Sequence, residues 1–241
     1  MKILTGKQKA PRKCLLYGTH GIGKSTWAAG APGCIMLNLE DGLNNIDCQR
    51  TEHLTTLDGV IEALDWLISS KHDFFTLAID SMDWLEALIH SEVARAANVA
   101  QINDIDYARG YTRALSFWDK ILLRLEMLRS DRRMSIVLIA HSEIKAINIP
   151  GENAFDRYQP AIHKLASAMF QEWVDEVFFG SIRTFTRTEK QGFGKERTIT
   201  VDGNERYIRT QETAAVLAKN RLGMPPEIEF TWEAYQTHFP V

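Results

Sequence analysis

The stretch Gly18-Thr-His-Gly-Ile-Gly-Lys24-Ser25 decides the fold. It follows a short apolar run, Leu-Leu-Tyr, and precedes a segment with helical character, so the pattern G-x-x-x-x-G-K-S stands between a strand and a helix. Glycines let the backbone wrap closely around an anion with its N–H groups pointing inward, and the following helix adds its positive N-terminal end. The stretch therefore predicts a phosphate-binding loop, called the P-loop below.

The P-loop side chains have separate expected roles. Lys24 is expected to reach the β- and γ-phosphates of a nucleoside triphosphate, and the Ser25 hydroxyl is expected to bind Mg²⁺. A glycine turn with an incidental lysine is the alternative, and the strand before and the helix after the loop disfavour it. The expected nucleotide contacts are Gly18, Thr19, His20, Gly21, Ile22, Gly23, Lys24, Ser25 and Thr26.

One apolar run precedes the P-loop, and apolar runs alternate with helical segments after it. Strands that are apolar throughout and alternate with helices predict an α/β fold with a mostly parallel sheet covered on both faces. Residues 143–160 carry turn formers and are interpreted as a long loop, and residues 181–210 are interpreted as antiparallel hairpins that extend the sheet. Strands are expected at 13–17, 34–39, 74–80, 134–140 and 174–179, and helices at 24–30, 57–70, 82–98, 110–130 and 161–172.

Composition excludes several classes of protein. Of 241 residues, 45% are apolar and 24% charged, which is ordinary globular composition and not that of a disordered or collagen-like chain. No run is long and apolar enough for a transmembrane helix, and no secretory signal is visible. Three cysteines without C-x-x-C spacing support neither a disulfide framework nor a zinc site, so we expect a cytoplasmic protein. Residues 1–12 form a basic arm, and residues 13–241 are expected to form one domain.

Polar residues follow three of the expected strands. Asp80 ends the run Phe-Phe-Thr-Leu-Ala-Ile-Asp and is expected to hold the Mg²⁺ shell together with Ser25. Glu40 follows the second strand, at the sheet edge where ligands of open α/β sheets bind, and is expected to activate water; Asp41 is the rival. His141 ends another strand and is expected to contact the γ-phosphate, with a purely structural histidine as the alternative.

In their order along the chain, these residues resemble the RecA-like ATPases. That resemblance implies a RecA-like P-loop NTPase core that hydrolyses ATP with Mg²⁺, with Glu40 as catalytic glutamate and His141 where the family often has glutamine. Lys219-Asn-Arg221-Leu-Gly223 looks like the K-x-R-x-G element of RecA-like hexameric helicases, so Lys219 and Arg221 are implied to complete a neighbouring subunit's site. Asp80 is followed by Ser81, whereas AAA+ motors commonly place a glutamate there, which argues against that class.

The closest resemblance is to small phage-encoded RecA-like proteins that bind single-stranded DNA and promote annealing or recombination. It implies a DNA-dependent ATPase that assembles into rings or filaments in the host cytoplasm, with a single-strand-binding protein as a candidate partner and no membrane. Two loops, around 99–113 and 144–164, are implied to face DNA, because basic residues interleaved with aromatics suit single strands. The candidates are Tyr107, Arg109, Arg113, Lys145, Arg157 and Lys164. Each of them has an ordinary surface position as its alternative.

Other functions remain open at this point. A helicase-like or loader-type replication ATPase would share the K-x-R-x-G element. A P-loop small-molecule kinase fits the size of the chain, but no acceptor pocket or arginine-rich lid is visible in the sequence. A nucleotide-gated DNA-binding scaffold without turnover is the non-enzymatic alternative. The choice of ATP over GTP comes from the resemblance alone.

Overall fold

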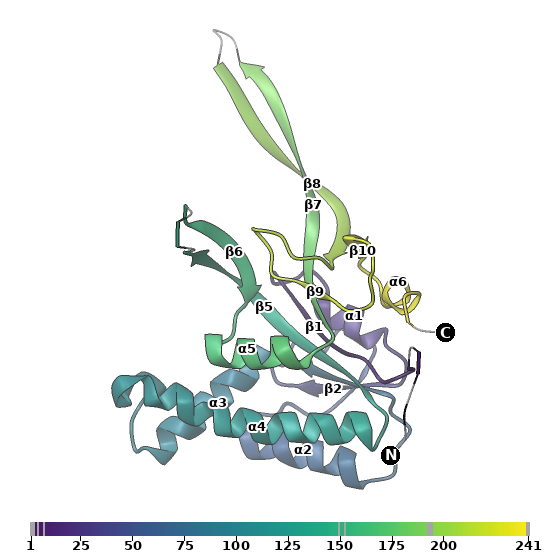
Figure 1. The fold of residues 1–241 in the computed structure, drawn as a ribbon, viewed down its shortest axis with the longest axis vertical. Helices are drawn as coiled ribbons and strands as arrows, with labels where there is room; N and C mark the ends of the chain where they lie inside the picture. The colour runs from purple at the N-terminus through teal and green to yellow at the C-terminus, as the bar shows by residue number, and fades with distance from the viewer. Residues whose placement is uncertain are drawn as a thin grey trace.

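The computed structural model describes residues 3, 5–6, 8–148, 150–151, 153–191 and 195–239. Its centre is one mixed sheet in which the neighbouring strands run in the order β10-β8-β7-β1-β5-β4-β2-β3 (Figure 1). The strands are β1 (Lys13–Gly18), β2 (Cys34–Asn38), β3 (Gln49–Arg50), β4 (Thr76–Asp80), β5 (Ser135–Ile147), β6 (Phe155–Pro160), β7 (Glu176–Gln191), β8 (Lys195–Arg209), β9 (Lys219–Asn220) and β10 (Glu227–Glu229).

The part of the sheet from β3 to β7 is parallel, and β8, β9 and β10 continue it in antiparallel fashion. This confirms the α/β class, the mostly parallel sheet and its antiparallel C-terminal extension. The helices are α1 (Lys24–Ala29), α2 (Leu57–Ser69), α3 (Met82–Ala96), α4 (Arg109–Ser130), α5 (Lys164–Trp173) and α6 (Trp232–Gln236). Among the described residues, no helix combines the length and the apolar character needed to cross a bilayer.

The central strand β1 is buried on both faces because successive side chains of a strand point to opposite sides. Leu15 and Tyr17 pack into the core under α2, α3, α4 and α5. Cys14 and Leu16 pack into the second core, which contains Trp27 of α1 and residues of α6. Figure 1 shows these two groups of helices on opposite sides of the sheet. The parallel order places β5 between the strand of the P-loop and β4, so the ends of β1 and β4 lie beside His141 in the middle of β5.

The expectation for residues 143–160 is wrong. Residues 143–160 do not form a long loop, because β5 continues to Ile147 and pairs with β6 from Ser142↔Pro160 to Ile147↔Phe155. The turn residues Pro150 and Gly151 lie only in the connection between these strands. Polar and apolar residues both lie on this exposed hairpin, so the segment lacks the apolar pattern of a core strand, and main-chain pairing holds it instead.

Two hairpins project from the same end of the molecule (Figure 1). One is formed by β5 and β6, called the β5–β6 hairpin below. The other is formed by β7 and β8, which pair from Phe179↔Arg209 out to Gln191↔Lys195 with a register shift between Ile182 and Thr184. This pairing confirms the antiparallel region expected over 181–210. The expected turn at Gly192 and Gly194 lies outside the described residues.

Candidate active site

The P-loop connects the end of β1 to the start of α1. Gly21 and Gly23 have φ of 75° and 100°, a left-handed conformation that glycine adopts without the steric cost of a side chain. Lys24 is buried, and its Nζ donates to the carbonyl oxygens of Gly18 at 3.0 Å and Thr19 at 2.9 Å. Burial lowers the pKa of Lys24, while the carboxylates of Asp80 and Glu40 oppose that shift. The ammonium is thus held at the loop, where phosphate oxygens can replace the two carbonyls as acceptors.

Asp80 and Ser25 fit the expected magnesium site. Asp80 is buried at the end of β4, and the Ser25 hydroxyl hydrogen-bonds to its carboxylate. Burial raises the pKa of Asp80, Glu40 adds to this rise, and the Ser25 hydrogen bond and the charge of Lys24 oppose it. A buried carboxylate beside a hydroxyl is an oxygen donor set of the kind that Mg²⁺ binds next to phosphates. A bound cation would also offset the cost of burying this charge.

Glu40 and His141 face each other across the same site. Because β2 and β4 pair in parallel, with Asn38 opposite Asp80, the chain just beyond β2 brings Glu40 to the end of β4. His141 Nε2 lies 3.8 Å from Glu40 Oε2, and the His141 ring stacks on His20 with centroids 3.8 Å apart. Asp41 is exposed and does not line the cavity described next. Of the two rival carboxylates, the structure thus brings Glu40 into the site.

A cavity of about 330 Å³ joins these groups. Its size suits a small ligand with several charged oxygens, and polar side chains dominate its wall. The two histidines and Glu40 also have their ligand atoms within 4.8 Å of one another, a mixed nitrogen and oxygen set that suits a zinc-type ion better than Mg²⁺. The lining residues are His20, Gly21, Gly23, Lys24, Ser25, Thr26, Glu40, Gly42, Ile46, Asp80 and His141.

Asp83 belongs to this site, although the sequence does not single it out. It lies in the first turn of α3, and its carboxylate accepts from the His141 backbone N–H at 3.1 Å and lies 2.8 Å from His141 Nδ1. Burial raises the pKa of Asp83, but the hydrogen bonds from His141 outweigh burial and hold the pKa below its ordinary value. The ionised carboxylate therefore accepts from Nδ1–H and leaves Nε2 facing Glu40.

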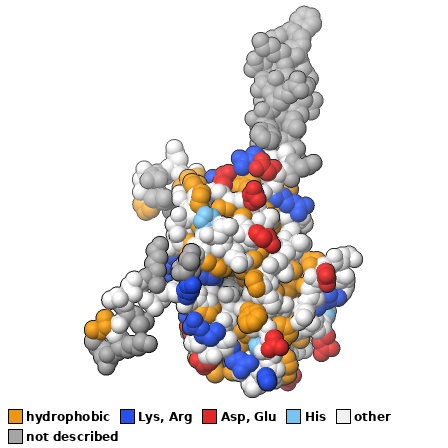
Figure 2. All heavy atoms as spheres, turned by 90° about the vertical axis from the view of Figure 1, so that its right-hand side faces the viewer, with side chains coloured by type: hydrophobic (Ala, Val, Ile, Leu, Met, Phe, Trp, Pro, Cys, Tyr) orange, Lys and Arg blue, Asp and Glu red, His pale blue; other side chains and the backbone are white. Residues whose placement is uncertain are grey.

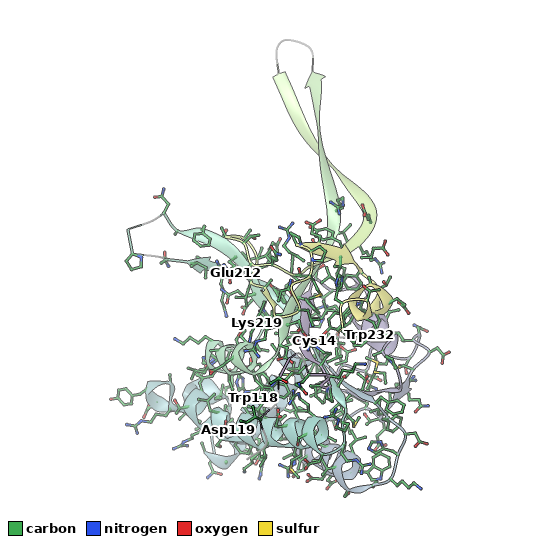
Figure 3. The ribbon with its side chains drawn as sticks, turned by 45° about the vertical axis from the view of Figure 1, so that its right-hand side comes forward. Cys14, Trp118, Asp119, Glu212, Lys219 and Trp232 are labelled. Atoms are coloured by element: carbon green, nitrogen blue, oxygen red, sulfur yellow. The ribbon has the colours of Figure 1, made fainter. Side chains whose placement is uncertain are left out.

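Lys219 and Arg221 lie away from the P-loop of their own chain. Lys219 pairs with Val177, near the start of β7, and its Nζ donates to the carbonyl oxygens of Gln171, Glu172 and Val174 at the end of α5 (Figure 3). Arg221 is exposed and donates to Asp175 at 3.0 Å. Within one chain neither side chain reaches the cavity, so their expected action on a neighbouring subunit stays a prediction.

The DNA-binding candidates occupy two neighbouring regions. Lys145 and Arg157 are directly opposite each other on the β5–β6 hairpin. Lys145 pairs with Glu143, and Arg157 pairs with Glu212 and donates to the Ala214 carbonyl.

The second region is the start of α4. Tyr107 is 88% exposed in the short helical turn Asp106–Ala108, and the Arg109 guanidinium lies over its ring. Arg113 is exposed in the first turns of α4, and Lys164 is exposed as the first residue of α5. The stack of Tyr111 on His163, with centroids 4.0 Å apart, joins the starts of α4 and α5. Arg109, Arg113 and Lys164 are therefore in helices, not in the loops implied by the resemblance.

Charged side chains of both signs lie on the surface of the protein. On the face drawn in Figure 2, several basic side chains lie along the lower left edge of the body, and acidic side chains lie among them and over the rest of this face. The starts of α4 and α5 lie toward the left in Figure 1, the side turned away from the viewer in Figure 2. Of the basic arm, Arg12 is held against the body of the protein, where it pairs with the buried Glu176.

The fold and the site define a P-loop NTPase: β1 leads into the P-loop, and Ser25, Asp80 and Lys24 converge on one cavity. The chain belongs to the AAA domain family, whose model matches residues 10–222. It therefore carries an AAA-type ATPase domain. No curated protein matches the chain. Asp80 is followed by Ser81, where AAA+ motors commonly have a glutamate, and the carboxylate that lines the cavity is that of Glu40, two residues beyond the end of β2.

Proposed function

We propose that the protein is an ATP-dependent single-stranded-DNA-binding protein that promotes annealing or homologous recombination and hydrolyses ATP between subunits of a ring or filament. One observation carries this proposal: His141, which faces Glu40 in the cavity, lies on the same strand as Lys145 of the exposed β5–β6 hairpin. Lys145 of the candidate DNA-binding hairpin is thus only four positions after His141 of the nucleotide site, on one continuous strand.

Hydrolysis follows from the positions of the chain's own groups. Lys24 and the P-loop backbone hold the phosphates, and Ser25 and Asp80 hold Mg²⁺, which neutralises charge on the phosphate oxygens when bound. Glu40, at the rim of the cavity, accepts a proton from the attacking water. His141, fixed by Asp83, turns Nε2 toward Glu40 and is the proposed contact of the terminal phosphate. When the terminal phosphate leaves, His141 on β5 loses this proposed contact.

The β5–β6 hairpin suits a flexible polyanion. Lys145 and Arg157 lie directly opposite each other on the two strands. Tyr158, the next residue on β6, points to the other face and stacks on Phe179. Lys145 pairs with the half-exposed Glu143, and such surface pairs contribute only about 0–1 kcal/mol, so exchanging this pair for a DNA phosphate costs little. Arg157 is more deeply held, because it pairs with Glu212 and also donates to the Ala214 carbonyl. Tyr107 with Arg109 offers a ring and a cation at the start of α4, where a base could stack.

Assembly of several subunits would bring a cation from one subunit to the nucleotide of the next. Arg221 is exposed and has one acidic partner, whereas Lys219 donates to three carbonyl oxygens. Arg221 is therefore the better candidate to reach the nucleotide of a neighbouring subunit, and Lys219 fixes the segment that carries it. A cation supplied in this way stabilises the transferring phosphoryl group and makes hydrolysis depend on assembly.

The test is the nucleotide dependence of DNA binding. We expect the protein to bind a fluorescent single strand more tightly with ATP than with ADP and to accelerate annealing of complementary strands. Glu40→Gln should still bind ATP, lose hydrolysis and hold DNA persistently. DNA binding that is equal with ATP, ADP and no nucleotide would contradict the proposal. Duplex unwinding with a fixed direction would favour a helicase-like replication ATPase instead.

A further inference from the structure

A second cavity, of about 300 Å³, adjoins the P-loop cavity. The two cavities share Gly23 and Thr26, so they lie on either side of the start of α1. We propose that the second cavity is the nucleobase and ribose subsite of the bound nucleotide, built by residues of the C-terminal extension. Its lining residues are Gly23, Thr26, Trp27, Gly30, Arg206, Phe230, Thr231, Trp232 and Glu233.

The residues shared by the two cavities indicate which part of a nucleotide the second cavity would bind. A nucleotide whose phosphates fill the P-loop must place its sugar and base beside the loop, because they are covalently attached to the α-phosphate. The second cavity begins at Thr26, the residue after the phosphate-binding Lys24 and Ser25. Its wall is more apolar than that of the P-loop cavity, since three aromatic side chains line it. Charged phosphates and a flat base therefore each meet a wall of matching chemistry.

Gly180 of the central strand β7 makes room for the Phe230 ring. A Cβ at Gly180 would lie 2.5 Å from the Phe230 ring, so only glycine at this place on β7 admits the ring. Gly180 in turn lies directly opposite Gly18, the first residue of the P-loop. Phe230 is half-buried and keeps part of its ring open to the cavity. A fixed, partly open ring beside the P-loop is a platform on which a base can stack.

Arg206 closes the cavity on the side of the P-loop. Its Nη1 lies 2.9 Å from the position that a Cβ at Gly23 would occupy, so the guanidinium extends from β8 across the loop. It belongs to the same chain as the loop, in contrast to the cations expected from a neighbouring subunit. A guanidinium here can lie over a base or bind the sugar–phosphate junction.

Trp232 and Glu233 complete the wall from α6. Trp232 packs on Trp27 of α1 with centroids 4.8 Å apart, which fixes α6 beside the P-loop helix (Figure 3). Glu233 is exposed and lines the cavity with a carboxylate that can accept from an exocyclic amino group. An aromatic platform with such an acceptor fits an aminopurine, as in ATP.

The inference rests on nucleotide binding by the proposed ATPase but not on DNA, so the experiment contains none. Calorimetry compares the affinities of ATP and inorganic tripolyphosphate, each with Mg²⁺. For Phe230→Ala we expect ATP affinity to fall about 10-fold and tripolyphosphate affinity to change less than about 2-fold, the size expected for one lost stacking contact. Lys24→Ala should weaken both ligands.

Matched variants separate stacking from folding. Phe230→Tyr keeps the ring and should bind ATP as the unmodified protein does, whereas Phe230→Leu keeps apolar volume and should resemble Phe230→Ala. Phe75→Ala removes an exposed ring outside both cavities and should change neither affinity. Equal losses of ATP and tripolyphosphate affinity in Phe230→Ala, or equal binding of the two ligands to the unmodified protein, would overturn the subsite. Failure of DNA-dependent annealing alone would leave these affinities, and the subsite, intact.

Discussion

Asp83 holds His141 by both its backbone and its ring: one carboxylate oxygen accepts from the backbone N–H, and the other lies 2.8 Å from Nδ1. The two residues are 58 positions apart, at the start of α3 and on β5. A carboxylate that holds one ring nitrogen fixes which nitrogen remains free. Nε2 is thereby aimed at the side of the cavity that contains Glu40.

Asp83→Asn should lower kcat for ATP hydrolysis by about 10- to 100-fold, the range found when a partner that orients a functional histidine is lost. The amide can still accept from the backbone N–H, so the fold should persist. It presents a donor where Nδ1–H needs an acceptor, so the ring rotates or changes its tautomer. KM for ATP should change less than about 3-fold, because P-loop contacts are untouched. Asp119→Asn on the surface of α4 is the control, and an unchanged kcat in Asp83→Asn would contradict this role.

Glu86 should make the stability of the folded protein depend on pH. It is buried on α3, where both carboxylate oxygens accept from the His163 backbone N–H, and burial raises its pKa to about 7. His90, Asp83, Glu143 and Lys145 are the other charged or titratable groups near it. Because the folded pKa exceeds the unfolded value of 4.5, folding favours the protonated acid. The stabilisation is complete below about pH 4.5 and is lost as pH rises through about 7.

Glu86→Gln should therefore be the more stable protein above pH 7, by an amount on the order of 1–3 kcal/mol, and should lose this advantage toward pH 5. The amide oxygen can still accept from the His163 N–H. Urea unfolding at pH 5, 6, 7 and 8 measures the difference. A stability difference that is constant from pH 5 to pH 8 would show that Glu86 does not titrate in this range.

Lys145→Ala combined with Arg157→Ala should weaken binding of single-stranded DNA for all sequences alike. A variant that contacts fewer phosphates releases fewer counterions when it binds. The magnitude of the slope of log affinity against log salt should therefore fall by about 0.7 for each lost contact, or by about 1.4 in total. Fluorescence anisotropy from 50 to 300 mM salt, about a 2.4-fold change in Debye length, gives the slope. Lys71→Ala, an exposed lysine after α2, serves as control. An unchanged slope would exclude the β5–β6 hairpin from the DNA contact.

Arg221 is tested by mixing two inactive variants. Arg221→Ala should lose at least about 100-fold in hydrolysis, as expected when a cation supplied between subunits is removed. Glu40→Gln should lose a similar factor through the general base. In a mixture of the two, about a quarter of the interfaces combine an intact Glu40 with an intact Arg221, so activity should reappear at up to that fraction. If hydrolysis does not reappear in a mixed oligomer, Arg221 does not act on a neighbouring subunit and has only the structural role of its ion pair with Asp175.

Local sequence patterns predict the sheet and the P-loop because those patterns are short-range. The run before Gly18 and the helix from Lys24 are contiguous with the motif, and apolar runs mark β2 and β4. The β5–β6 hairpin was not predicted because its strands are exposed and carry little apolar periodicity. Its turn residues, Pro150 and Gly151, were visible in the sequence, but the pairing on both sides of them was not.

Contacts between distant segments lie beyond sequence reasoning. Asp83 meets His141, and Glu86 meets the His163 N–H 77 positions away. A carboxylate in the first turn of a helix is ordinarily explained by the helix dipole, so Asp83 carries no distinctive signal. Phe230 is not singled out by the sequence either, and only its contact with Gly180, which lies opposite Gly18, shows why its ring lies beside the P-loop.

The most direct test of the central claim is the rate of ATP hydrolysis with and without single-stranded DNA at moderate salt. The account predicts a rate that rises at least about 10-fold with DNA, is abolished in Lys24→Ala and Glu40→Gln, and loses its DNA dependence in the Lys145→Ala, Arg157→Ala double variant. A rate that is equal with and without DNA, yet still abolished by Lys24→Ala, would contradict a DNA-dependent ATPase and leave an ATPase that acts on another partner.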